Sequence, residues 1–431
     1  LGNIDVCSKR FLTNKVDRSV SGQIAQQQCV GPFHTPLSNY SLVTLGYYDY
    51  VGIASAIGEK PILGINNPRA QGNMSVGEMI TNIMGVYVGD ITKIKCSANW
   101  MWPLSCEGEM SKLYVVAKEM CDTLINLGIG IDGGKDSLSM SVKTKDKIIK
   151  SPGELVITGY APCNNIYKKV TPNLKQINSN LILINVSNKS NKCRLGGSVF
   201  SRECLNNNNN LECPELNDCE NLIKMFNIIQ TYIYNGDILS LHDVSDGGLI
   251  TTICEMAISS GIGVDLLYKV KNKKQQHFYE YLFNEELGIV CEVENKILSK
   301  LTEDLNKLNI NYEILGYTNN LKQLNIWKND IIYEKIHLTT ISKYWESTST
   351  QLDKYQSANK FSDIEFNEIT KLIKPYYYLS EQLKDFCTTT YLSNINIKRT
   401  KYKVAIIRDE GSNGDKEMCG VFKYVGFDVY N

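Results

Sequence analysis

A polar break at Pro162, Asn164 and Asn165 separates two motif-rich blocks of the chain. Proline and asparagine grouped in this way mark boundaries between folded elements. The second block then opens with an apolar strand at residues 181–184. Because 431 residues are too many for one ordinary core, and 43% of them are hydrophobic, we expect each block to fold around its own interior.

The pattern of apolar segments predicts four parts. Residues 1–165 and 180–345 are two α/β units, and residues 346–400 are polar and irregular, typical of a linker with short helices. Residues 401–431 read as strand, glycine turn, amphipathic helix (415–424) and second strand, the opening of a β-α-β unit. This last part ends too soon to bury its own sheet, and the first residue is not Met. We therefore expect segments missing at both ends.

The composition restricts the class of ligand. Lys and Arg number 46, as do Asp and Glu, so no broad basic surface is expected for a nucleic acid, and a small charged ligand bridged by a metal ion fits better. No apolar run is long enough to cross a bilayer. The 14 cysteines contain no C-x-x-C pair and are scattered in apolar stretches, which indicates reduced thiols in a cytoplasmic protein.

A glycine-rich segment offers one possible phosphate site. Its residues, placed after an expected strand, are Asp132, Gly133, Gly134, Lys135, Asp136 and Ser137. Glycines allow backbone N–H groups to approach a phosphate, and a lysine supplies the countercharge. On the motif alone, a glycine turn with solvated charges is favoured. The G-x-G-x-x-G match at residues 128–133 is accidental, because an expected helix, 110–126, precedes it.

Two further segments carry possible magnesium ligands. Glu78 and Asn82 lie one helical turn apart and project from one face, as a hard cation would require. Ser75 and Glu78 also match a capping box, in which Glu78 only closes the start of the helix. From spacing alone the capping box is favoured.

The second segment, residues 239–249, reads as a strand, a Gly-Gly turn and an apolar helix. Asp243 falls at the end of the strand, a usual place for ligands. Ser245 and Asp246 could be N-caps or nucleotide contacts, and His242 is more typical of hydrogen-bonded structure than of a catalytic base.

Taken together, these segments resemble the large single-chain formylglycinamide ribonucleotide amidotransferase family, and they occur in the family's order over nearly the whole chain. The matching segments are residues 9–22 (KRFLTNKVDRSVSG), 26–32 (QQQCVGP), 35–37, 56–59, 78–82, 97–101, 132–140, 195–198, 242–248 and 283–288.

The resemblance implies a second copy of the aminoimidazole-ribonucleotide-synthetase-like fold with two subdomains, which binds Mg²⁺ and ATP or ADP. The metal ligands it implies are Asn39, Glu78, Asn82 and Asp243. The nucleotide contacts it implies are Lys9, Leu12, Gln28, Ser38, Asn39 and Ser245. The segment from Gly133 to Ser137 would line a substrate or phosphate cleft between the copies.

One position departs from the family pattern. The family usually has Asp where this chain has Asn39, which keeps an oxygen but loses a full negative charge. Magnesium would bind more weakly there, or would meet Asn39 through a water molecule. The resemblance implies a structural rather than a reactive nucleotide in this copy, as in bacterial members, so a weakened site would be tolerated.

The resemblance also implies an activity, a C–N ligase that uses ATP and glutamine to convert formylglycinamide ribonucleotide to formylglycinamidine ribonucleotide in purine biosynthesis. Residues 403–414 resemble the opening of the family's glutaminase domain, so we expect no catalytic residue within this chain and no activity from it alone. Its partners would be the first synthetase copy and the glutaminase domain of the same polypeptide. A purely structural nucleotide-binding module, or another synthetase of the same fold, are the alternatives.

Overall fold

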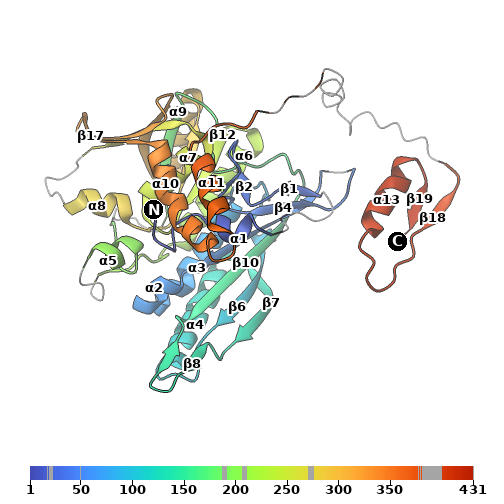
Figure 1. Ribbon diagram of the computed structural model, residues 1–431, viewed down its shortest axis with the longest axis horizontal. Helices are drawn as coiled ribbons and strands as arrows, with labels where there is room; N and C mark the ends of the chain where they lie inside the picture. The colour runs from blue at the N-terminus through green and yellow to red at the C-terminus, as the bar shows by residue number, and fades with distance from the viewer. Residues whose placement is uncertain are drawn as a thin grey trace.

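The computed structural model describes residues 1–16, 18, 23–48, 50–186, 192–205, 211–269, 276–376, 378, 380 and 400–430. Within these ranges the chain forms two large sheets, each with helices packed on it, and a small C-terminal unit (Figure 1). This unit contacts the first one where the hydroxyl of Tyr48 donates to the carbonyl of Gly420 at 2.6 Å. No helix in these ranges is both long enough and apolar enough to cross a membrane. The mixed α/β fold expected from the sequence is confirmed.

The first unit is built on a six-stranded sheet that is antiparallel except for its last pair, β6 and β7. In order across the sheet, the strands are β1 (Ile24–Gln26), β4 (Ser41–Thr44), β5 (Gly52–Glu59), β10 (Glu154–Cys163), β6 (Lys95–Met101) and β7 (Gly130–Ser137). Two two-stranded ribbons accompany it, β2 (Cys29–Val30) with β3 (Thr35–Pro36) and β8 (Ser141–Lys143) with β9 (Ile148–Lys150).

Helices cover one face of this sheet. They are α2 (Pro61–Asn66), α3 (Pro68–Ile83) and α4 (Glu109–Leu127), with a 3-10 turn at Ile91–Lys93. Helix α3 lies so close to β5 that a Cβ added at Gly58 would stand 2.1 Å from the carbonyl oxygen of Ser75. Residues of β5 alternate between buried and exposed, so the opposite face of the sheet is left open.

The second unit has a seven-stranded sheet, antiparallel apart from the β13–β16 pair. In order across the sheet, the strands are β12 (Ile238–Val244), β14 (Gly288–Val293), β11 (Asn180–Asn185), β15 (Asn311–Asn319), β13 (Gly263–Tyr268), β16 (Gln323–Lys328) and β17 (Ile331–His337). Its helices are α5 (Val199–Cys204), α6 (Cys219–Asn235), α7 (Gly248–Ser260), α8 (Gln276–Phe283), α9 (Asn295–Lys307), α10 (Leu338–Asp353) and α11 (Asn359–Ile369).

One of the two buried hydrophobic clusters among the described residues spans both units, and the other lies in the second unit. The shared cluster runs from Met79 of α3 to Phe226 of α6 and on to Ile182 of β11. Gln230 of α6 is buried inside this contact, where its amide accepts from the backbone N–H of Val88 at 2.7 Å and donates to nearby carbonyl oxygens. Burial of this extent fixes the orientation of the two units, so side chains from both can form one site.

The N-terminal helix α1 (Arg10–Thr13) packs on α10 of the second unit. The buried guanidinium of Arg10 pairs with Glu346 at 2.9 Å. Helix α10 continues to Asp353, which is buried, and α11 follows, so much of the described part of the expected linker is helical. Residues 377, 379 and 381–399 of that linker lie outside the described residues.

The C-terminal unit has the expected β-α-β order. Strands β18 (Lys403–Ala405) and β19 (Asp428–Tyr430) pair in parallel, and α13 (Asp415–Tyr424) connects them. Cys419 lies within α13, as its position in the sequence indicated. Most of the side chains on this small sheet are exposed or half-buried.

Candidate functional site

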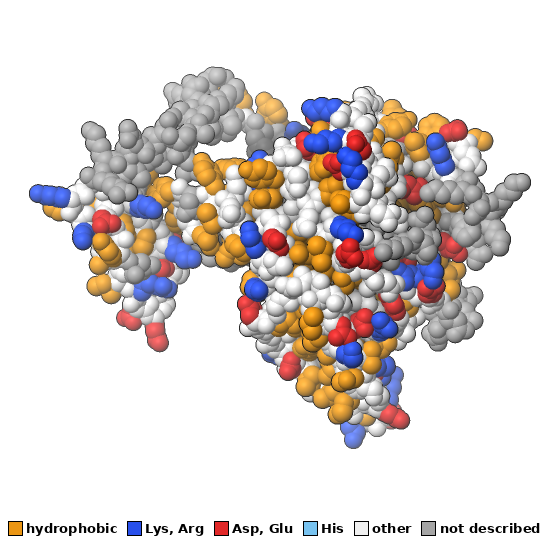
Figure 2. Space-filling model, turned by 180° about the vertical axis from the view of Figure 1, so that it is seen from behind, with side chains coloured by type: hydrophobic (Ala, Val, Ile, Leu, Met, Phe, Trp, Pro, Cys, Tyr) orange, Lys and Arg blue, Asp and Glu red, His pale blue; other side chains and the backbone are white. Residues whose placement is uncertain are grey.

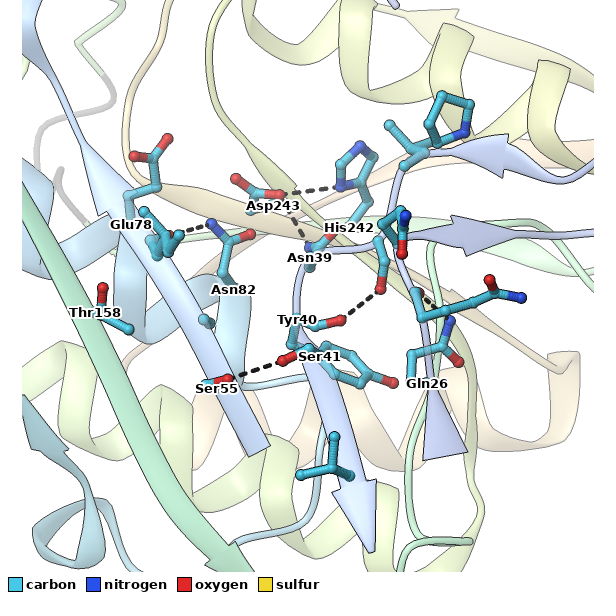
Figure 3. A pocket seen from close by; sticks show the side chains of 18 of the residues that line it. Gln26, Asn39, Tyr40, Ser41, Ser55, Glu78, Asn82, Thr158, His242 and Asp243 are labelled. Carbon is cyan, nitrogen blue, oxygen red and sulfur yellow. Dashed lines mark hydrogen bonds and ion pairs between the residues drawn. The ribbon is translucent and has the colours of Figure 1, made fainter. Parts of the chain in front are cut away.

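A cavity of about 590 Å³ opens where the end of β12 meets β4, β5 and α3. Residues of both units line it, and the close-up in Figure 3 shows their side chains converging from several elements. Predicted site residues in its lining are Gln28, Ser38, Asn39, Glu78, Asn82, Asp243 and Ser245. Five of them come from three separate segments of the first unit, and the tertiary fold brings them to the strand end of the second.

Glu78 and Asn82 lie in the third and fourth turns of α3, on the side that faces the cavity. The helix begins at Pro68, and the side chain of Asn67 caps it by accepting from the N–H of Ala70. The capping-box interpretation of Ser75 and Glu78 is therefore wrong, because neither residue is near the start of the helix. Asn82 donates to the carbonyl of Ile57 at 2.9 Å, which holds its amide against β5.

Strand β12 and helix α7 form the expected strand–turn–helix. Asp243 is buried at the end of β12, and Gly247 makes the turn with a φ of 84°. Glycine is favoured there because side chains make this left-handed conformation costly. No side chain caps α7, so the N-cap interpretation of Ser245 and Asp246 is wrong.

Asp243 is held from two sides, as Figure 3 shows. Asn39 donates its amide to Asp243 Oδ1 at 3.0 Å, and His242 Nδ1 lies 3.0 Å from the same oxygen. The other ring nitrogen of His242 lies 3.0 Å from Glu255 Oε2. Burial lowers the pKa of His242, but the two carboxylates outweigh it and raise the pKa to about 9. His242 is thus hydrogen-bonded within the protein through Nε2, and its structural role stays a prediction.

Lys60, which the sequence analysis did not select, occupies the centre of the contact between the units. Its ammonium lies 2.6 Å from Glu78 Oε1, 2.9 Å from Ser245 Oγ and 3.0 Å from Asp246 Oδ1. Burial lowers the pKa of Lys60, while Asp246 and Glu78 raise it well above its ordinary value. The sequence feature that could have indicated Lys60 is its place directly after Gly58 and Glu59, between the end of a strand and a helix that begins with proline.

Several predicted residues lie outside this cavity. The ammonium of Lys9 donates to the carbonyl oxygens of Ile4, Asp5 and Cys7, and Leu12 is exposed on α1. The segment expected to form a glycine-rich loop after a strand is itself strand β7 at the sheet edge, with Gly133, Gly134, Lys135 and Asp136 exposed and Ser137 half-buried. Lys135 donates to Ser137 at 2.5 Å. A loop at this position was a wrong prediction.

The side chains present suit a hard cation only in part. Asn39, Asn82 and Asp243 offer carboxylate and amide oxygens, which Mg²⁺ prefers. Glu78, however, already accepts from Lys60 and Ser245 on one oxygen and from the backbone N–H of Glu59 on the other. In the described part of the chain, no three His, Cys, Asp or Glu side chains converge as a metal site.

Charges elsewhere are interspersed. On the face of the molecule in Figure 2, Lys and Arg side chains alternate with Asp and Glu among the described residues. This arrangement resembles an ordinary protein surface more than a basic nucleic-acid interface.

Two family models match the chain. A formylglycinamide ribonucleotide amidotransferase model (FGAR-AT PurM_N-like domain) matches residues 8–162, and an AIR synthase related protein C-terminal domain matches residues 183–328. The solved structure "T. maritima PurL complexed with FGAR" aligns with a TM-score of 0.56 over 71% of this chain and 47% of that one. "T. maritima PurL complexed with ADP" gives a TM-score of 0.54 over 73% and 47%. At 10% identity in both cases, these structures support the fold alone.

Curated relatives match almost the entire chain. A probable phosphoribosylformylglycinamidine synthase of Arabidopsis thaliana, described as chloroplastic/mitochondrial, is 37% identical over 99% of this chain and 30% of its own length. The phosphoribosylformylglycinamidine synthases of Drosophila melanogaster and Homo sapiens are 36% and 34% identical, over 100% and 99% of this chain and 32% and 31% of their own lengths. The chain thus spans about a third of the length of these relatives. With both family models matched in order, the chain belongs to the phosphoribosylformylglycinamidine synthase family.

Proposed function

We propose that this chain supplies a nucleotide-binding site and a supporting surface to an ATP- and glutamine-dependent ligase that makes formylglycinamidine ribonucleotide. The carrying observation is the cavity between the two units, where Gln28, Ser38, Asn39, Asp243 and Ser245 line one space. A volume of about 590 Å³ is within the usual range for a nucleotide-sized ligand.

In the whole enzyme, ammonia released from glutamine at a cysteine thiolate would reach the synthetase region. There ATP would phosphorylate the formamide oxygen of the substrate, which converts a poor leaving oxygen into phosphate. Ammonia would then displace the phosphate to give the amidine. Within this chain we assign binding and positioning roles only, and we propose that it is inactive alone.

Mg²⁺, when bound, would neutralise polyphosphate charge in the cavity. Asn39, Asn82 and Asp243 are the residues that would hold it, with Glu78 behind them. Asn39 and His242 hold the Asp243 carboxylate in place before any ligand binds. Ordering this side chain therefore costs little free energy when the ligand binds. Gln28, just before β2, and Ser38, between β3 and β4, would contact the nucleotide.

The open face of the first sheet supports contact with a further part of the same polypeptide, the first synthetase copy. Ile53 and Ile57 of β5 are 38% and 51% exposed, and Ile131 of β7 is 40% exposed. Apolar side chains gathered on one sheet face are typical of an interaction surface. The exposed segment from Gly133 to Ser137 would then line a phosphate or substrate cleft between the copies. The β-α-β unit at residues 403–430 is proposed to begin the glutaminase domain.

An alternative is that the nucleotide only holds the fold together. The internal pairing of Lys60, Glu78 and Asp246 favours this, because it leaves few charges for chemistry. Another synthetase of the same fold is less well supported, since the relatives match 99% of the chain, including its C-terminal unit. The reduced cysteines and the absence of a spanning helix in the described residues fit a cytoplasmic location.

Titration calorimetry with ADP and ATP in MgCl₂ tests the proposal. We expect the chain to bind both nucleotides, and Asp243→Asn to weaken binding by about tenfold or more. Asp122→Asn, on the exposed surface of α4, is the matched control and should bind like the wild type. No nucleotide binding by the wild-type chain, or equal affinity in Asp243→Asn, would contradict the proposed site. Slow hydrolysis of the bound ATP would count against the structural alternative.

A further inference from the structure

Two contacts between the units meet at a single ammonium group, which lies against Glu78 and Ser245 of the cavity lining. Lys60 follows β5 of the first unit directly, and its partners Ser245 and Asp246 lie in the turn after β12 of the second. Its third partner is Glu78 of α3. An ammonium has three N–H donors, so these three partners saturate it. Lys60 is only 6% exposed, which keeps water from competing for these donors.

Asn39 makes a second link of the same kind. It lies just before β4 of the first unit and donates to Asp243 Oδ1 of the second at 3.0 Å. An aspartate at position 39 would place two carboxylates side by side, and one of them would need a cation or a proton. The amide replaces that repulsion with a hydrogen bond.

Both links reduce the negative charge that a metal ion would otherwise have to neutralise in the site. Phosphate groups and carboxylates repel each other unless a positive charge lies between them or the carboxylates are already neutralised. Here the charge of Glu78 is neutralised by Lys60, and each carboxylate oxygen of Glu78 has a hydrogen-bond donor. A divalent ion at Glu78 would have to displace a buried ammonium from 2.6 Å.

We propose that Lys60 is the resident cation of this nucleotide site and takes the place of a divalent ion at Glu78. Together with the Asn39–Asp243 hydrogen bond, it holds the two units together without a divalent ion. The ligand is a nucleoside diphosphate or triphosphate, so the inference rests on the proposed function. Its consequence is that nucleotide binding to this chain depends only weakly on Mg²⁺. Lys60 acts as a positioning residue, because its donors are used within the protein.

The experiment measures ADP affinity by titration calorimetry, in EDTA and in MgCl₂, for the wild type, Lys60→Met, Lys60→Arg and Asn39→Asp. For the wild type we expect the two conditions to differ by less than about tenfold. Lys60→Met should lose about tenfold or more in EDTA and recover with Mg²⁺, because the metal then takes over the vacated charge. Lys60→Arg keeps the charge and should stay close to the wild type. Asn39→Asp should become dependent on Mg²⁺.

Lys118→Met is the matched control, since Lys118 pairs with Asp122 on the surface of α4. It should bind ADP like the wild type in both conditions. Thermal unfolding with and without Mg²⁺ provides a second readout, and Mg²⁺ should stabilise Asn39→Asp and Lys60→Met more than the wild type. If Lys60→Met does not fold, the wild-type comparison between EDTA and MgCl₂ still decides the question. Wild-type ADP binding that EDTA abolishes would overturn the role of Lys60 alone, whereas no ADP binding in either condition would overturn the proposed function.

Discussion

The Nε2 atom of His242 lies 3.0 Å from Oε2 of Glu255, and this contact ties the wall of the cavity to helix α7. The other oxygen of Glu255 accepts from the indole N–H of Trp345 at 3.0 Å. Trp345 belongs to α10, so the position of Asp243 is supported by a chain of buried side chains that extends well beyond the cavity.

Glu255→Ala tests this support. The substitution leaves a buried ring nitrogen of His242 without its partner. The indole N–H of Trp345 still has an acceptor, the carbonyl of Val6 at 3.1 Å. An unsatisfied buried polar group costs about 1–3 kcal/mol, so the free energy of unfolding in urea should fall by that amount. Glu220→Ala removes an ion pair whose carboxylate is 76% exposed, and should change stability by less than about 0.5 kcal/mol. Equal losses of unfolding free energy in the two variants would show that Glu255 does not support the position of His242 and Asp243.

The ion pair of Arg10 and Glu346 fixes the N-terminal segment on α10. Its two side chains are 10% and 3% exposed. Glu346→Ala should cost about 3–5 kcal/mol in the free energy of unfolding, because it leaves a buried guanidinium unpaired. The double variant Arg10→Met with Glu346→Leu should recover most of that loss. A double variant as unstable as Glu346→Ala would mean that the pairing itself, rather than the unpaired charge, carries the stability.

Glu285 should give the protein a pH-dependent stability. Burial, with a smaller contribution from Asp246, raises its pKa from 4.5 to about 8. The folded state therefore binds a proton between these values that the unfolded state has released, and stability falls as pH rises from 4.5 to about 8. The slope from one group is at most about 1.4 kcal/mol per pH unit.

Glu285→Gln should flatten this dependence. One carboxylate oxygen of Glu285 accepts from the N–H groups of Gly247 and Val199 at 2.8 and 2.9 Å, and a glutamine oxygen can keep both contacts. Urea unfolding at several pH values between 5 and 8 (about one unit apart) measures the slope. Glu303→Gln, at an exposed position on α9, should retain the wild-type slope. A slope unchanged in Glu285→Gln would assign the titration to another group.

Gly58→Ala should displace the helix that carries Glu78 and Asn82. The new Cβ would meet the carbonyl of Ser75 at 2.1 Å and the N–H of Met79 at 2.4 Å, both backbone atoms that cannot rotate away. Overpacking of this kind costs about 1–3 kcal/mol, and ADP affinity should fall with it. At Gly130 the nearest atom is the ammonium of Lys95 at 3.8 Å, so Gly130→Ala is the control and should be neutral. Normal ADP binding by Gly58→Ala would show that nucleotide affinity does not depend on the position of α3.

Elements set by local pattern were predictable. The strand, Gly-Gly turn and helix at residues 239–249 became β12 and α7, and the helix expected at 415–424 is α13 with the same bounds. Periodic apolar residues and glycine turns act within one element, so the sequence carries them directly. Asn67 and Pro68 are typical N-cap and first-turn residues and mark the true start of α3, whereas Ser75 and Glu78 match a capping box within the helix and so indicate a false start.

Strand β7 could not be predicted in this way. Its sequence, with Gly130, Gly133 and Gly134, has little intrinsic preference for a strand. It is a strand because its backbone pairs in parallel with β6, a partner more than thirty residues earlier in the chain. Here pairing overrides local preference, and the glycine-rich motif becomes a sheet edge.

By itself, the sequence determined the family, the two-unit organisation and the short segments that carry Glu78, Asn82 and Asp243. Only the tertiary structure decided which side chains meet. Glu78 is neutralised by Lys60, and Asn39 donates to Asp243 across 204 positions of the chain. The physical reason is that a charge is compensated by whatever lies within a few ångströms of it, and packing of two sheets on one core sets those distances where spacing along the chain does not.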